Sequence, residues 1–290
     1  MPAEFARQPR SLTELDRWKA TELRQFLLYT GPLVLQDVLS QEQYYHFLSL
    51  TIGMSILLDE NDSRRAHYLA YAQSLLEHFV DTCSELYGET FPTYNIHSIK
   101  HIADDVFNFK CSLNELSAFP FENHLQSIKK LVRNGKNPVA QVTKRLAEKA
   151  NSHKHMKQWR GKPYFISAKA PNHCFMLQTE QVVFVREKRQ DGLLVVDVID
   201  THVTRQLFDL PCESKLINIV YVKDRDLIRA KRRLMESKNL HKKAVCLPHA
   251  QGFAIFPLLH SCKFALSPHH PINMAWPPHQ KQPQKQTRIK

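Results

Sequence analysis

Two histidines and an aspartate in the middle of the chain could bind a metal ion. His97 and His101 are four residues apart and therefore share one face of a helix, and Asp104 lies one further turn along, near the same face. Imidazole and carboxylate groups are common ligands of divalent metals. These three residues are therefore candidate metal ligands. A His-x-x-x-His pair is not specific, however, and the two histidines could instead be packing residues that hydrogen-bond to a carbonyl or carboxylate.

Glu122 is a candidate catalytic acid. It follows Phe119-Pro120-Phe121, where the proline and its aromatic neighbours fix the start of a helix. A carboxylate held on a helix beside cationic side chains suits a metal-dependent phosphoryl-transfer site. The alternative is that Glu122 only stabilises the helix dipole, which acids in the first turn commonly do.

A cationic segment follows Glu122 and could bind a polyanion. Glu148 is the only acid between Asn123 and Pro163, whereas lysine and arginine recur throughout that stretch. A second basic run covers 225–243, and the whole chain has a net charge of +12. Such runs can be solvated helix faces, but two of them favour a nucleic-acid partner. The candidate nucleic-acid-binding residues are Lys129, Lys130, Arg133, Lys136, Lys144 and Arg145.

The elements that carry these residues indicate an α+β protein. Apolar residues recur at helical spacing from Ser11 to about residue 160, and Phe121, Leu125, Ile128 and Val132 should form the buried face of one helix. After Gly161 the pattern becomes strand-like and predicts a small antiparallel β-module. The helices are predicted at 11–30, 41–58, 63–87, 96–109, 122–133 and 139–155. The strands are predicted at 164–168, 173–178, 181–188, 193–200, 218–222, 244–249 and 253–259, with a basic helix or linker at 225–240.

This pattern divides the chain into four parts. Residues 1–10 read as a loose leader, 11–160 as a helical domain, 161–266 as a small β-rich module and 267–290 as a disordered basic tail. We expect the β-module to fold as a separate unit.

Composition excludes several classes of protein. The 7 glycines include no GxGxxG and no P-loop pattern, so no nucleotide-binding cradle is predicted. The 6 cysteines are scattered without a CxxC pair, which favours reduced thiols inside a cell. No signal peptide and no apolar run long enough to span a membrane is visible.

Several stretches resemble the C-terminal part of CACTA (En/Spm-like) transposases of animals. The most distinctive are YNIHSIKHIADDV at 94–106 and LSAFPFENHLQSIKKLVRNGKNPVAQVTKRLAE at 116–148. The segment 10–47 and the strand-like stretches at 173–185, 209–222 and 253–260 are also similar. The resemblance covers about Arg10 to His260.

The resemblance implies a relation to an RNase H-like transposase core with an Asp-Asp-Glu site for Mg²⁺ or Mn²⁺. In that family the histidine pair corresponds to His97 and His101, and the acid of the FEN motif, here Glu122, corresponds to the third acid. The first two acids would lie upstream, and Asp16 and Asp37 are poor substitutes because both lie in helix-like sequence. We therefore expect a nuclear, DNA-associated, transposon-derived protein that is inactive alone.

The resemblance also implies a partner for such a protein, either the catalytic region of a transposase or a second copy of this chain. Two other functions stay open: a non-catalytic nucleic-acid-binding module, and a protein-interaction module built on the β-rich region.

Overall fold

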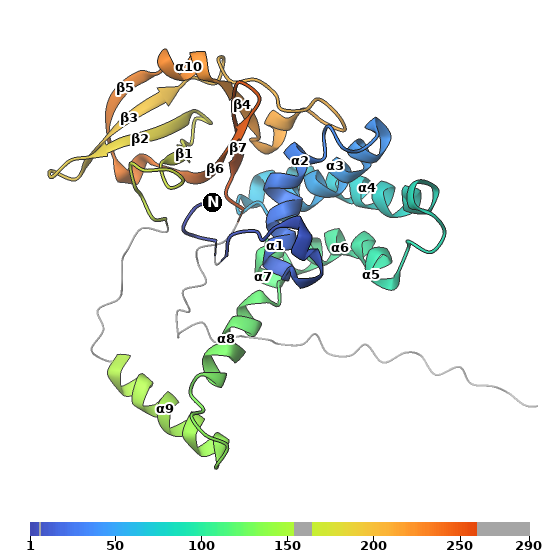
Figure 1. The fold of residues 1–290 in the computed structure, drawn as a ribbon, viewed down its shortest axis with the longest axis vertical. Helices are drawn as coiled ribbons and strands as arrows, with labels where there is room; N and C mark the ends of the chain where they lie inside the picture. Colours follow the sequence, from blue (N-terminus) through green and yellow to red (C-terminus); the bar gives the residue numbers. More distant parts are fainter. Residues whose placement is uncertain (6, 154–163, 260–290) are drawn as a thin grey trace, which may run out of the picture.

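The computed structural model describes residues 1–5, 7–153 and 164–259, and it confirms the α+β class. Helices occupy the first part of the chain and a curled, seven-stranded antiparallel sheet follows (Figure 1). The α-helices are α1 Ala20–Gln25, α2 Gly31–Val34, α3 Gln41–Leu57, α4 Asp62–Tyr87, α5 Tyr94–His97, α6 Ile102–Phe109, α7 Leu113–Leu116, α8 Phe119–Lys129, α9 Pro138–His153 and α10 Asp224–Ile228. Shorter helical turns are η1 Leu12–Arg17, η2 Phe26–Thr30, η3 Ser98–His101, η4 Ser214–Ile217 and η5 Ser237–Asn239.

The long helices α3 and α4 form the centre of the helical part, and both were predicted from the sequence. Ser40 caps α3, because its hydroxyl accepts a hydrogen bond from the Gln43 amide and the Gln43 side chain accepts one in return. Asn61 caps α4, because its side-chain oxygen accepts a hydrogen bond from the Arg64 amide. The two helices approach closely at Gly53, where an added Cβ would lie 2.8 Å from the side chain of Leu76.

The sheet has the strand order β4-β7-β6-β1-β2-β3-β5, and every neighbouring pair is antiparallel. Its curl brings β4, at one end of the order, into one apolar cluster with β2 and β3 near the other end. The strands are β1 Cys174–Met176, β2 Val182–Lys188, β3 Leu193–Ile199, β4 Val220–Lys223, β5 Lys231–Glu236, β6 Lys242–His249 and β7 Gly252–Pro257.

The sheet and the helices share one hydrophobic core. Successive side chains of a strand point to opposite faces. Val245 and Phe256 therefore belong to the cluster that contains the buried residues of α3 and α4, while Ala244 and Ile255 face the interior of the curled sheet. The β-rich region is thus packed on the helices through a common apolar interface.

Four local predictions were wrong. The stretch 225–240, predicted as a basic helix or linker, contains α10 and the edge strand β5. β5 pairs along its whole length with β3, but it is exposed and so lacks the apolar alternation of a half-buried strand. The stretch 164–168 forms no strand. The helix predicted at 96–109 is interrupted by η3, and the helix predicted at 11–30 is interrupted at the extended residues Trp18 and Lys19.

The first ten residues, which we expected to be a loose leader, contact both parts of the molecule. The Glu4 carboxylate lies 2.6 Å from the ammonium of Lys243 on β6, and the ring of Phe5 packs edge-on against Tyr29. Arg10 forms an ion pair with Glu22. The predicted break at residues 161–163 and the predicted tail at 267–290 lie outside the described residues. Among the helices that are described, none is both long enough and apolar enough to cross a membrane.

Candidate nucleic-acid interface

Helices α8 and α9 form an arm that extends from the helical body, which consists of α1 to α7 (Figure 1). The arm carries all six predicted nucleic-acid-binding residues. Lys129, Lys130, Arg133, Lys136 and Lys144 are exposed and Arg145 is half-buried. None of the six forms an ion pair with an acid of the described part of the chain. Their charge is therefore available to a ligand.

The side chain of Gln141 fixes the loop between the two helices. Its amide nitrogen donates to the Oδ1 atom of Asn134 at 2.8 Å and to the carbonyl of Lys136 at 2.6 Å. Its amide oxygen accepts from the backbone N–H of Arg133 at 3.0 Å. Pro138 is the first residue of α9, a position where its missing N–H is not needed. The loop therefore holds its cations beside the N-terminus of a 16-residue helix, which itself favours anions.

Glu122 lies in the first turn of α8, as predicted, and is exposed. Its helix is joined to the body at Phe119, whose ring lies 5.8 Å from the guanidinium carbon of Arg24. The face that we expected to be buried is largely open: Phe121 is 53% and Leu125 is 64% exposed. The prediction of that buried face was wrong because α8 extends away from the rest of the helical part. Helical periodicity identifies an apolar face, but it does not show whether another part of the same chain covers that face.

The histidine pair lies at the surface. His97 ends α5 and His101 ends η3, and their rings are 5.4 Å apart in an edge-to-face arrangement. His97, His101 and Asp104 are all exposed, and neither ring hydrogen-bonds to another described residue. Within the described residues no group of three or more His, Cys, Asp or Glu side chains is placed to hold a metal ion. The geometry favours neither buried packing histidines nor a metal-ligand set made by the described residues alone.

The second basic run differs from the arm because acids of β3 and the following turn partly neutralise it. Arg232 and Arg186 both bind Asp197, at 3.0 and 2.6 Å, and Lys231 binds Asp200 at 2.8 Å. Burial acts to raise the pKa of Asp197, but the bonds from Arg232 and Arg186 outweigh it and lower the pKa overall. These cations are engaged within the sheet, so the run on β5 is a weaker candidate for a polyanion site.

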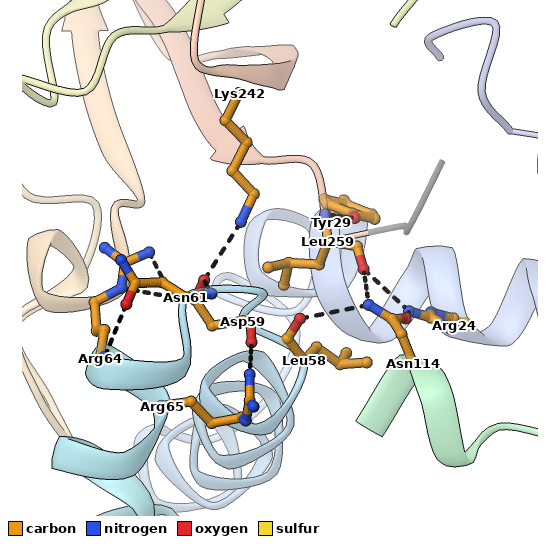
Figure 2. A network of polar contacts seen from close by, with 10 residues as sticks. All are labelled: Arg24, Tyr29, Leu58, Asp59, Asn61, Arg64, Arg65, Asn114, Lys242 and Leu259. Atoms are coloured by element: carbon orange, nitrogen blue, oxygen red, sulfur yellow. Dashed lines mark hydrogen bonds and ion pairs between the residues drawn. The ribbon is translucent and has the colours of Figure 1, made fainter. Parts of the chain in front are cut away.

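A polar cluster that the sequence did not reveal joins the α3–α4 connection to β6 (Figure 2). The Asp59 carboxylate pairs with Arg64 and lies 3.6 Å from the Lys242 ammonium, and the Asp59 carbonyl accepts from Arg65 at 2.6 Å. A cavity of about 480 Å³ lies beside it, and Glu180 is also among the residues that line this cavity. Burial lowers the pKa of Lys242, and the neighbouring Asp59 partly offsets this. The cluster fastens the helices to the sheet, and no sequence spacing could indicate a pair as distant as Asp59 and Lys242.

Comparison with known proteins identifies one related domain. A family model described as a domain of unknown function (DUF8592) matches residues 136–258. The matched segment begins in the loop before α9 and ends just after β7, so it includes half of the arm together with the whole sheet. No curated protein and no solved structure matches the chain.

Proposed function

We propose that this protein binds duplex DNA with little sequence preference through the arm formed by α8 and α9. The observation that supports this function is the row of arm cations, at Lys129, Lys130, Arg133 and Lys136, which have no acidic partner in the described structure. Phosphate contacts of this kind supply affinity without reading base sequence. The partly neutralised run on β5 would contribute less.

We further propose that the protein is transposon-derived and related to the C-terminal part of an RNase H-like CACTA transposase, and that it acts in the nucleus. The sequence resemblance around Glu122 supports this origin. Glu122 would then be the third acid of a site for Mg²⁺ or Mn²⁺ that is completed by aspartates of another polypeptide region, since two-metal catalysis needs several carboxylates. The protein on its own would bind DNA without cleaving it.

The test is a measurement of DNA affinity against salt concentration. Fluorescence anisotropy with labelled duplexes of unrelated sequence should give similar affinities and a steep loss of binding as salt rises. Replacing Lys129, Lys130, Arg133 and Lys136 together by alanine should weaken binding on every duplex. The slope of log affinity against log salt should fall by about 0.9 for each phosphate contact removed.

A matched variant distinguishes DNA binding through the arm from a general effect of net charge. Replacing Lys169, Lys188, Arg205 and Arg229 by alanine removes the same number of exposed cations from the sheet region. This control should retain both the affinity and the salt slope of the unmodified protein. Equal losses in the two variants, or no binding of the unmodified protein at low salt, would overturn the proposed interface.

A further inference from the structure

An apolar groove opens on the helical body, near the root of the arm. Its volume is about 460 Å³, which is in the range of ligand-binding sites. The walls come from α1, η2, α3, α6 and α7 and from the first residue of α8. Leu23, on its rim, is 50% exposed. The lining includes Leu27, Met54, Ile102, Leu113 and Phe119.

Arg24 lies in the wall of this groove and has no anionic partner among the described residues. Its Nη2 atom donates to the carbonyl of Leu259 at 3.2 Å and to the Oδ1 atom of Asn114 (Figure 2). The guanidinium carbon also lies 5.8 Å from the centre of the Phe119 ring. All of these partners are neutral, the buried Nε atom has no acceptor, and no described acid pairs with Arg24. Burial lowers the pKa of Arg24, but arginine stays charged in proteins. A largely desolvated cation that has only neutral partners is unfavourable, so a carboxylate would be bound strongly here.

We propose that this groove binds a segment of a partner protein that presents large apolar side chains and one carboxylate, with the carboxylate paired to Arg24. Charge favours an external partner over the chain's own C-terminal residues. Residues 260–290 contain no Asp or Glu side chain that could pair with Arg24. The net charge of +12 would also attract an acidic partner. This site is separate from the DNA-binding cations of the arm, so either proposal can fail without the other.

The experiment is a selection from a library of short random peptides displayed on phage, with the full chain as the immobilised target. The unmodified protein should enrich peptides that combine large apolar residues with an acid. Arg24→Met, which keeps the volume of the side chain but removes its charge, should enrich apolar peptides without the acid. A synthetic peptide of the first consensus should bind this variant about tenfold more weakly or worse.

Two substitutions of exposed leucines locate the binding. Leu23→Lys changes the rim of the groove and should abolish the enrichment, whereas Leu234→Lys on β5 changes a leucine that is 57% exposed and should leave it intact. Circular dichroism melting verifies that each variant folds. The proposal is overturned if the full chain enriches nothing, if the consensus has no acid, or if Arg24→Met selects the same peptides. Sedimentation of a dimer that Leu23→Lys converts to a monomer would instead assign the groove to a second copy of the chain.

Discussion

Glu22 shows how a single carboxylate is held in this protein. Its side chain is fully buried, and it accepts hydrogen bonds from Arg10 Nε at 2.9 Å and from the Lys19 backbone N–H at 2.8 Å. The bond from Arg10, followed by that from the Lys19 amide, lowers the pKa of Glu22 from 4.5 to about 2. The ionised form is therefore favoured in the folded protein, and the same contacts attach the N-terminal segment to α1.

This depressed pKa predicts a loss of stability in acid. Because the folded pKa lies below the unfolded one, the contribution of Glu22 to the free energy of unfolding is fully present above about pH 4.5 and is lost as the pH falls toward 2. Urea unfolding at a series of pH values should show this slope, and Glu22→Gln should flatten it. The exposed Glu14→Gln should leave the slope unchanged, and an equal effect of both substitutions would contradict the assignment.

Glu122 allows a test of the catalytic hypothesis. Because its side chain is exposed, Glu122→Gln should change the free energy of unfolding by less than about 0.5 kcal/mol. DNA affinity should stay the same or rise slightly, since a negative charge near phosphate is removed. A plasmid-nicking assay with Mg²⁺ or Mn²⁺ should detect no cleavage by either form.

A longer protein that includes an upstream domain with the two aspartates should cleave DNA, and there Glu122→Gln should abolish cleavage while DNA binding is retained. Cleavage by the unmodified short chain would show that the active site lies elsewhere. Full activity of the long Glu122→Gln protein would show that Glu122 is not catalytic and only stabilises the start of α8.

At the scale of the elements, the loop between α8 and α9 depends on one side chain. Gln141→Ala removes the acceptor of the Arg133 amide and the donor to Lys136, so the loop should open more often while both helices persist. Hydrogen–deuterium exchange should speed up in residues 133–137, and the melting temperature of the body should not change. Thr143→Ala on the exposed face of α9 is the matched control, and exchange that is equally fast in both variants would contradict the role of Gln141.

The sequence predicts an element well when the signals for that element are local. α3 and α4 have side-chain caps and many buried apolar residues, and most strands alternate or are continuously apolar, so their positions follow from the sequence. The sequence of β5 resembles a charged linker, because its partners, Asp197 among them, lie on β3, which is far away in the sequence. The basic residues of the arm could be named in advance, but the groove could not. Arg24, Asn114 and Leu259 meet only in the folded chain.

At the scale of the whole molecule, the N-terminal residues join the helices to the sheet. The Lys243 side chain is completely buried, and its ammonium donates to the carbonyl of Phe165 and to Asn172, each at 2.8 Å, as well as pairing with Glu4. The Glu4 carboxylate also accepts from the Phe165 backbone N–H at 2.9 Å. Figure 1 shows the N-terminus between the helical part and the sheet. Together with the shared core, this contact should make the described parts unfold as one unit.

A double-mutant cycle on Glu4 and Lys243 tests that coupling. Glu4→Gln or Lys243→Met alone leaves one charge buried without its counter-ion, so each should lower the free energy of unfolding by about 3–5 kcal/mol. The double variant removes both charges and should lose much less than the sum, with a coupling of up to about 3 kcal/mol. Urea unfolding followed by far-ultraviolet circular dichroism and by tryptophan fluorescence should give one coincident transition. Strictly additive losses would show that the pair does not interact, and two separated transitions would show that the helices and the sheet unfold independently despite their common core.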